Sequence, residues 1–226
     1  MGQASGDGKG AEVGLSDVVY GAYERRLARG LDPATVPRHV GVMLDGNRRW
    51  AKVNGFDTAD GHQAGADKIK DLLAWCEQAG VELVTLWLLS TDNLRRDSSE
   101  LDPLLRIIEK AVADLAATAR WRLHPIGALD LLPEETAEAL REAEVATRGV
   151  KGLTVNVAVG YGGRREIADA VRHLLIEHAA LGTPIEVIAK NVSVEEIARH
   201  LYTRGQPDPD LVIRTSGEQR LGGFLL

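Results

Sequence analysis

Short runs of apolar residues alternate along the chain with stretches in which apolar residues recur every three or four positions. Such runs predict buried strands, and the wider spacing predicts helices that turn one face to a core. We expect strands at residues 40–44, 83–89, 121–126, 153–159 and 211–213. We expect helices at residues 61–80, from Asp97 to about residue 118, from Pro133 to before Gly149, at residues 164–180 and after Ser193.

This alternation predicts a single-domain α/β fold. Strands that are apolar on both sides are typical of a mostly parallel β-sheet with helices on both faces. Residues 1–11 are rich in Gly, Ser, Asp and Lys, so we expect a disordered tail there and the domain at residues 12–226. Ligands bind such sheets beyond the carboxyl ends of the strands, and we expect the functional residues at those ends.

Composition narrows the class of protein. The 226 residues are 44% hydrophobic, and the formal net charge of -6 argues against nucleic acid as the main partner. The single cysteine, Cys76, allows no intrachain disulfide and fits a reducing compartment. No apolar run approaches the roughly 18 residues that a membrane span needs, and the N-terminus lacks the apolar segment of a signal peptide. We expect a cytoplasmic protein without a transmembrane segment.

The first expected strand ends in a carboxylate that is followed by a glycine and two arginines. Asp45 and Gly46 precede Asn47, Arg48 and Arg49. Backbone N–H groups at the start of a helix attract anions, the glycine permits close approach, and the arginines add charge-assisted hydrogen bonds. Asp45 could hold Mg²⁺, which takes one or two carboxylates and completes its octahedron with phosphate oxygens and water. The same residues also fit a capped helix with two surface arginines, and their spacing favours neither reading.

Two further strand ends carry polar side chains of a similar kind. After residues 83–89 come Ser90, Thr91, Asp92, Asn93 and, slightly later, Arg96. After residues 211–213, Arg214 and Arg220 bracket a glycine-containing turn suited to phosphate. Three such loops at one edge of a parallel sheet favour an anion site, although the second loop alone fits a helix entry better. His62 would either contact an anion or cap a helix in solvent.

Signatures of several other functions are absent from the sequence. It contains no Walker A motif, no G-x-G-x-x-G after a strand and no G-x-S-x-G nucleophile elbow. No cysteine and histidine spacing indicates zinc. The Asp-Asp-x-x-Asp cluster of the all-helical trans-prenyltransferases is also missing. The glycine-rich residues 160–165 indicate tight packing between a strand and a helix.

The polar loops resemble the motifs of the cis-prenyltransferase (undecaprenyl diphosphate synthase) family. The resemblance rests on HVGVMLDGNRRWA at 39–51, GHQAG at 61–65, LSTDN at 89–93, NVAVGYGGR at 156–164 and DLVIRTSGEQR at 210–220. It runs from about residue 37 to the end, and residues 47–49 with Leu94 are most similar to actinobacterial short-chain (Z)-farnesyl diphosphate synthases. It implies an enzyme that uses Mg²⁺ to join isopentenyl diphosphate to an allylic diphosphate, forming a Z double bond and releasing diphosphate.

The resemblance also implies roles for individual residues. Asp45 would be catalytic and hold the Mg²⁺, and Asn93 would occupy the position assigned to proton removal. The allylic diphosphate would contact Gly46, Asn47, Arg48, Arg49 and His62, with Trp50 as a wall of the site. Ser90, Thr91 and Asp92 would lie near the reacting carbons. Isopentenyl diphosphate would be bound by Arg96, Arg214 and Arg220.

The sequence departs from the family at several positions. Thr58 stands where a diphosphate-binding arginine is usual, Leu94 where Trp is usual, and Gly222 where Ser is common. The family continues past Leu226 into a segment with a second Mg²⁺-binding Glu and dimer contacts. We therefore expect that the chain is truncated there and forms a homodimer when full length. A lipid product implies at most peripheral contact with a membrane.

Three alternatives come from other functional classes. A non-catalytic cis-prenyltransferase-like subunit that stabilises a partner characteristically loses the aspartate and arginines of the first loop. An unrelated nucleotide-binding α/β protein would carry a glycine fingerprint. An enzyme of the same fold that makes branched, head-to-middle products lacks much of the isopentenyl-binding arginine set. Asp45, Arg49, Asn93, Arg214 and Arg220 together favour the condensing enzyme.

Overall fold

The computed structural model describes residues 21, 23, 26–27 and 29–225. The chain divides into two compact units, residues 1–36 and 37–226. In the first unit, the described residues at 21, 23, 26, 27 and 29 are helical. The tail expected at residues 1–11 lies outside the described residues. The second unit contains the sheet.

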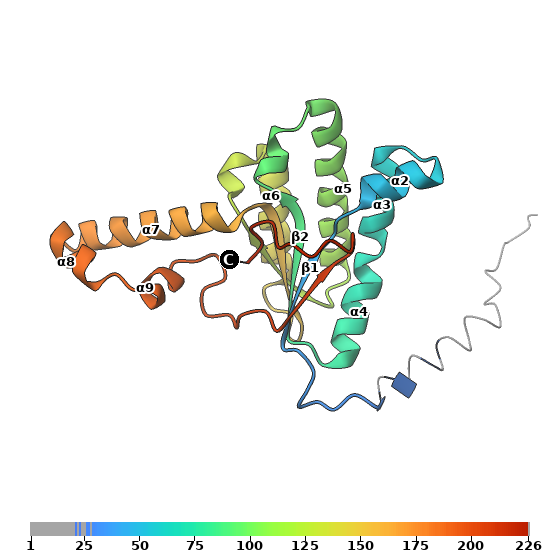
Figure 1. Ribbon diagram of the computed structural model, residues 1–226, viewed down its shortest axis with the longest axis horizontal. Coiled ribbons are helices and arrows are strands. Elements are labelled where there is room, and N and C mark those ends of the chain that lie inside the picture. Colours follow the sequence, from blue (N-terminus) through green and yellow to red (C-terminus); the bar gives the residue numbers. More distant parts are fainter. Residues whose placement is uncertain (1–20, 22, 24–25, 28, 226) are drawn as a thin grey trace, which may run out of the picture. The chain divides into compact units, whose positions relative to one another are not determined.

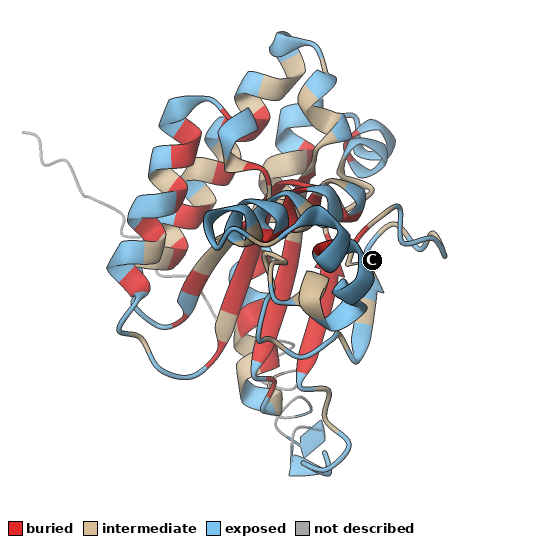
Figure 2. Cartoon of the chain, turned by 90° about the vertical axis from the view of Figure 1, so that its left-hand side faces the viewer, coloured by how far each residue is buried: buried red, intermediate tan, exposed pale blue. Residues whose placement is uncertain are grey.

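Five strands of the second unit form one sheet in the order β3-β4-β2-β1-β5, and every neighbouring pair is parallel (Figure 1). The strands are β1 His39–Met43, β2 Leu83–Ser90, β3 Arg122–Ile126, β4 Thr154–Tyr161 and β5 Leu211–Arg214. The central strands β1, β2 and β4 are buried along most of their length, as expected for a sheet covered on both faces (Figure 2). The predicted α/β fold with a parallel sheet is confirmed.

The helices lie on both sides of this sheet. Figure 1 shows α2 to α5 on one side and α7 to α9 extending from the other. The helices are α2 Asn47–Asn54, α3 Thr58–Asp67, α4 Ile69–Ala79, α5 Ser98–Ala117, α6 Glu134–Thr147, α7 Gly163–Ala180, α8 Ile185–Asn191 and α9 Val194–Ala198, with short 3₁₀ turns η1 Asp92–Arg95 and η2 Leu129–Leu131. Of the helices in the described residues, none has the length and apolar character to cross a membrane.

The helix predicted at residues 61–80 is in fact two helices, α3 and α4, divided at Lys68. The Lys68 N–H bonds to the carbonyl oxygen of Gly65 at 3.3 Å, a three-residue contact that tightens the last turn of α3. Helix α3 also begins earlier than predicted, because the backbone N–H of Asp57 is capped by the Asp60 carboxylate at 3.1 Å. The spacing of apolar residues therefore predicted one long helix, because it does not report the local change in hydrogen bonding at Lys68.

A chain of buried polar side chains joins three strands to the loop before β5. His39 donates from Nδ1 to the Pro207 carbonyl at 2.8 Å, because a carbonyl can only accept. In a neutral ring, Nε2 then accepts from the Thr85 hydroxyl at 2.8 Å. Asn156 donates to the same hydroxyl oxygen at 3.0 Å and exchanges two hydrogen bonds with Gln206, at 2.6 and 3.0 Å. This arrangement requires a neutral imidazole.

His39 is only 1% exposed, and this burial lowers the pKa of its ring. Unfolding returns the pKa to its ordinary value of 6.5, so the unfolded chain binds the proton more readily. The stability that neutral His39 contributes is complete above that pH and is lost as the pH falls below it. A protonated ring would also reverse the bond to Thr85 and leave the threonine hydroxyl without an acceptor.

We expect His39→Gln to lower the free energy of unfolding by about 1–3 kcal/mol near neutral pH, since it breaks buried hydrogen bonds. When the pH is lowered from roughly 8 to 5.5, the free energy of unfolding should fall less for the variant than for the wild type. Urea unfolding at both pH values measures the two effects. His173→Gln, at an exposed position, serves as the control and should keep the wild-type pH dependence. The same pH dependence in both variants would contradict the assignment.

Candidate active site

The carboxyl ends of β1, β2 and β5 open into one cavity of about 530 Å³. Strand β1 lies between β2 and β5, so the loops that follow these strands meet although β5 comes last in the sequence. The polar lining residues are Asp45, Asn47, Arg48, Arg49, His62, Ser90, Asn93, Arg96, Arg214, Glu218 and Arg220, and the Gly46 backbone joins them. The other lining residues are apolar and come from β2, from α3 to α5 and from the end of β1, among them Met43, Ile69, Leu88, Leu104 and Ile107.

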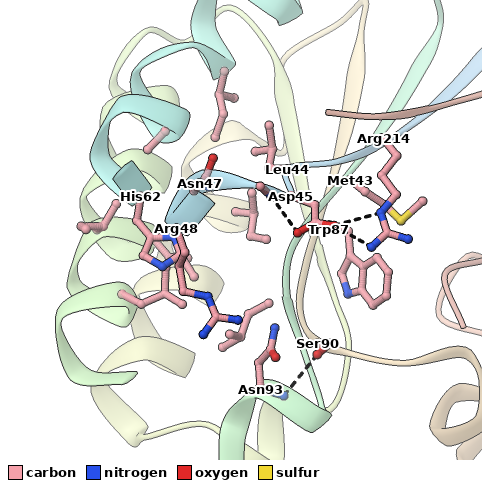
Figure 3. A pocket seen from close by; sticks show the side chains of 18 of the residues that line it. Met43, Leu44, Asp45, Asn47, Arg48, His62, Trp87, Ser90, Asn93 and Arg214 are labelled. Carbon is pink, nitrogen blue, oxygen red and sulfur yellow. Dashed lines mark hydrogen bonds and ion pairs between the residues drawn. The ribbon is translucent and has the colours of Figure 1, made fainter. Parts of the chain in front are cut away.

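Asp45 is held by residues from β5 and the loop after it. Arg214 donates from Nε and Nη2 to Asp45 Oδ2, at 2.9 and 2.6 Å (Figure 3). The Ser216 hydroxyl donates to the same oxygen at 2.9 Å. The Gly46 N–H donates to Oδ1 at 2.7 Å. Burial alone would raise the pKa of Asp45, but the bonds from Arg214, Ser216 and Gly46 outweigh burial and lower it. Asp45 is therefore ionised at neutral pH.

Glu100 organises a first group of side chains, two arginines and a histidine. We call it the Glu100 cluster: Glu100, Arg48, Arg96 and His62. Glu100 Oε1 accepts from Arg96 Nη1 at 2.8 Å and lies 3.6 Å from Arg48 Nη1. Arg96 is the partly buried member, with its side chain 18% exposed against 59% for Arg48. Burial lowers the pKa of His62, and the neighbouring Arg96 and Arg48 lower it further. Its Nε2 is buried with no hydrogen-bond partner among the described residues.

Glu218 organises a second group, the Glu218 cluster: Glu218, Arg49, Arg214 and Arg220. Glu218 Oε2 lies 3.0 Å from Arg214 Nη2 and 2.8 Å from Arg220 Nε, and Oε1 lies 3.4 Å from Arg49 Nη2. Arg214 is the least exposed arginine here, with its side chain 15% exposed against 65% for Arg49 and 75% for Arg220. Each cluster thus combines one partly buried arginine with at least one exposed arginine. In Figure 3, His62 and Arg48 lie on one side of Asp45 and Arg214 lies on the other.

Most of the predicted site residues line this cavity, and three do not. Asn93 and Ser90 line it, with the Asn93 N–H bonded to Ser90 Oγ at 3.2 Å. Thr91 and Asp92 border a separate hollow, where Thr91 packs against Gly162. Trp50 stacks on Phe56 at 5.7 Å between ring centroids, is 46% exposed and lies outside the cavity lining. The contact at Gly162 is with the loop after β2, so the tight strand-to-helix packing expected at residues 160–165 stays a prediction.

The structure also groups the arginines differently from what the family resemblance implies. Arg96 was expected with Arg214 and Arg220, whereas its carboxylate partner is shared with Arg48. Arg49 was expected with Arg48, whereas its carboxylate partner is shared with Arg214 and Arg220. Glu100 and Glu218 were assigned no role at the site by the sequence. Each follows the least exposed arginine of its cluster by four residues, but neither pair lies within one helix, so this spacing gave no signal for ion pairing. The spacing of residues 97–100 instead indicated a helix cap, and Asp97 alone provides that cap by accepting from the Ser99 N–H at 2.9 Å.

The donor set at Asp45 fits a metal that is shared with a substrate. Within the part of the chain that the structure describes, no three His, Cys, Asp or Glu side chains gather into a metal site. Mg²⁺ needs only one or two carboxylates when phosphate oxygens and water complete its coordination. Asp45, ionised and surrounded by anion-binding arginines, suits that mode of binding.

Two glycines allow α3 to pack directly on the start of α2. A Cβ at Gly61 would overlap the backbone carbonyl oxygen of Asn47, and one at Gly65 would lie 2.8 Å from the Asn47 side chain. Neither contact leaves room for a methyl group. This packing places His62, the neighbour of Gly61, beside the loop that carries Asp45.

Comparison with known proteins assigns this site to a family. The sequence profile of the undecaprenyl diphosphate synthases matches residues 43–226. The chain belongs to this cis-prenyltransferase family. It is 62% identical over 209 residues to the (2Z,6E)-farnesyl diphosphate synthase of Thermobifida fusca, an alignment that covers 92% of this chain and 82% of that protein. It is 53% identical over 216 residues to the short-chain Z-isoprenyl diphosphate synthase of Mycobacterium leprae, covering 94% and 82%.

A solved structure of another cis-prenyltransferase-like enzyme shares the fold. Lavandulyl diphosphate synthase from Lavandula x intermedia, in complex with dimethylallyl diphosphate, superimposes with a TM-score of 0.76 at 34% identity. The match covers 84% of this chain and 82% of that chain. The family and the enzyme class that the sequence motifs predicted are confirmed.

We expect Gly61→Ala to destabilise this cis-prenyltransferase by about 1–3 kcal/mol, because the added methyl group must push α3 away from the rigid backbone of α2. The matched control is Gly149→Ala, where a Cβ would meet nothing within 4 Å. It should change stability by no more than about 0.5 kcal/mol. Urea unfolding of both variants measures the difference. Equal stabilities would show that α3 does not pack on Asn47 in this way.

Proposed function

We propose that this cis-prenyltransferase condenses one isopentenyl diphosphate with a ten-carbon allylic diphosphate in a Mg²⁺-dependent reaction. The observation that carries the proposal is the pair of arginine clusters on either side of Asp45, in a cavity whose remaining wall is mainly apolar. Two clusters suit two diphosphates, because bidentate arginine contacts are well matched to phosphate oxygens. The apolar wall suits hydrocarbon chains.

The allylic diphosphate is assigned to the Glu100 cluster. Arg48 belongs to α2, the helix that begins directly after Asp45 and Gly46, so the helix N-terminus and the cluster act on the same anion. The pKa of His62 is lowered, which makes its ring neutral, and a neutral ring can donate one hydrogen bond from Nε2 to a phosphate oxygen. We assign Arg96 to this diphosphate as well, because it shares Glu100 with Arg48.

Isopentenyl diphosphate is assigned to the Glu218 cluster. Arg214 is held in place by Asp45 and Glu218, and the exposed Arg220 and Arg49 can close over a bound anion. The presence of both Arg214 and Arg220 favours a condensing enzyme over the head-to-middle alternative. The two substrates then lie on opposite sides of Asp45.

The arrangement stabilises the charges that develop as the reaction proceeds. When the allylic C–O bond breaks, negative charge grows on the leaving diphosphate, and the fixed donors of the Glu100 cluster face that charge. Asp45 would hold a Mg²⁺ ion, which when bound supplies further neutralisation of the diphosphate charge. The alkene of isopentenyl diphosphate, held by the Glu218 cluster, attacks the allylic carbon and forms the new carbon–carbon bond.

Loss of a proton then gives the new Z double bond. Asn93 lines the cavity, but an amide is not a base at neutral pH. We therefore propose that Asn93 positions the proton with its amide oxygen, and that the released diphosphate accepts the proton. The bond from the Asn93 backbone to Ser90 fixes the residue for this role.

The name of the Thermobifida fusca relative indicates the primer. That product has a Z double bond next to the diphosphate and an E double bond beyond it. A cis-type condensation creates only the Z bond, so the E bond must enter with the primer. The primer is then a ten-carbon allylic diphosphate with an E double bond, and one condensation gives a fifteen-carbon product.

Incubation with labelled isopentenyl diphosphate and allylic primers of five, ten or fifteen carbons tests this proposal. We expect the ten-carbon primer to give one main product of fifteen carbons, identified by chromatography. A chelator should abolish turnover and added Mg²⁺ should restore it. Products of many lengths, or a branched product from the five-carbon primer, would contradict the proposed reaction.

Single arginine variants test the assignment of the two diphosphates. Arg220→Gln should raise the KM for isopentenyl diphosphate by about tenfold to a hundredfold, the effect of losing a charged hydrogen bond, and change the KM for the primer much less. Arg96→Gln should do the reverse. Steady-state kinetics with each substrate varied in turn give both values. Equal effects of one variant on both substrates would argue against two separate clusters.

The expected homodimer and the cytoplasmic location stay predictions. Several apolar side chains on α7 to α9 are exposed, among them Ile176 at 60% and Leu181 at 72%. An exposed apolar surface of this kind is typical of an interface between subunits. The mass of the protein in solution tests the dimer.

A further inference from the structure

The ion pair between Arg214 and Asp45 occupies both of the groups that the proposed reaction needs. Asp45 Oδ2 accepts from two nitrogens of Arg214 and from Ser216. All three nitrogens of the Arg214 guanidinium are engaged, since Nη1 also donates to the Arg220 carbonyl at 2.6 Å and Nη2 lies 3.0 Å from Glu218. A cation at Asp45 and an anion at Arg214 would therefore each have to replace the same contacts.

We propose that the Arg214–Asp45 pair is a latch that couples cation binding at Asp45 to diphosphate binding at Arg214. The proposal rests on the proposed function, which makes Asp45 a metal ligand and Arg214 a diphosphate ligand. A cation that binds Asp45 displaces Arg214 from Oδ2. A diphosphate that binds Arg214 draws its Nε and Nη2 away from Asp45. Either ligand breaks the ion pair. The residue that binds the second ligand, Arg214 or Asp45, is then no longer held by the other.

Linkage requires this coupling to be reciprocal: each ligand raises the affinity for the other by the same factor. The pair is partly shielded, with the Arg214 side chain 15% exposed and that of Asp45 44% exposed. Coupling between sites is typically about fivefold to 150-fold, and a partly shielded pair suggests about tenfold. Ser216 and Gly46 keep the Asp45 carboxylate in place when Arg214 leaves. The empty enzyme would therefore bind a cation or a diphosphate weakly, and both together more tightly.

Mg²⁺ and diphosphate also bind each other in solution, so each ligand is best measured alone. The first experiment titrates Mn²⁺ into the protein without any diphosphate and follows binding by electron paramagnetic resonance. Arg214→Gln and Arg220→Gln each remove one positive charge from the Glu218 cluster, but only Arg214 touches Asp45. We expect Arg214→Gln to bind Mn²⁺ about tenfold more tightly than the wild type, and Arg220→Gln to differ by less than about threefold.

The second experiment measures inorganic pyrophosphate binding by calorimetry in the presence of a chelator. Asp45→Asn should bind pyrophosphate about tenfold more tightly than the wild type, because Arg214 is no longer held. In an Arg214→Gln background the same substitution should give no such gain. A gain that persists without Arg214 would mean that Asp45 repels the anion through space, and the latch would be wrong.

The outcomes separate the latch from the proposed function. If Asp45→Asn bound Mn²⁺ as the wild type does, the metal assignment would fail and the latch with it. If Asp45 proved necessary but Arg214→Gln and Arg220→Gln bound Mn²⁺ equally, the latch alone would be overturned. Circular dichroism checks that each variant folds. Should Arg214→Gln fail to fold, Arg214→Lys keeps the charge with a weaker pair, so it should give a smaller gain in Mn²⁺ affinity, and no gain would overturn the proposal.

Discussion

The parallel pairing of β1 with β2 on one side and β5 on the other is the constraint on which the site depends. Met43 is in register with both Trp87 and Arg214, so β1 and β5 end at the same level, and β2 continues three residues further to Ser90. Asp45, two residues beyond Met43, then meets the loop after β5. Thr215 fixes the distance between the two loops, because its hydroxyl accepts from the Asp45 N–H at 2.9 Å and also contacts the Asp45 carbonyl at 2.6 Å.

The concentration of positive charge at this edge requires carboxylates from the protein itself. Five arginines line one cavity, and their mutual repulsion would destabilise the folded state if no carboxylates paired with them. Glu100, Glu218 and Asp45 each pair with at least one of them. The two partly buried arginines, Arg96 and Arg214, depend most on these partners, since removing a charged partner costs more as a site becomes less exposed to water. The contacts that stabilise the empty site therefore also hold these two arginines close to where an anion would bind.

Much of the fold could be predicted from the sequence, because strand formation here follows from local apolar runs. All five strands lie within two residues of their predicted positions. The parallel sheet then brought the three polar loops together as expected. The division of the helix at Lys68 was missed because it depends on one local hydrogen bond, which apolar spacing does not report.

The grouping of the site residues was harder to predict, because it depends on contacts between distant segments. Glu100 has the spacing of a helix cap, yet its carboxylate pairs with Arg48, which comes from a helix about fifty residues earlier. Glu218 likewise joins Arg49 to Arg220 across most of the chain. Trp50 sits next to predicted site residues in the sequence but turns to Phe56. Sequence motifs identified the loops, and only their packing separates the two clusters.

The central claim is that two arginine clusters bind two diphosphates on either side of Asp45. The most direct test is a crystal structure of the protein with isopentenyl diphosphate, a non-reactive thio analogue of the ten-carbon allylic diphosphate, and Mn²⁺ located by anomalous scattering. The account predicts one diphosphate at Arg48, Arg96 and His62, the other at Arg214 and Arg220, and the metal at Asp45. Both diphosphates within one cluster, or a metal bound away from Asp45, would contradict it.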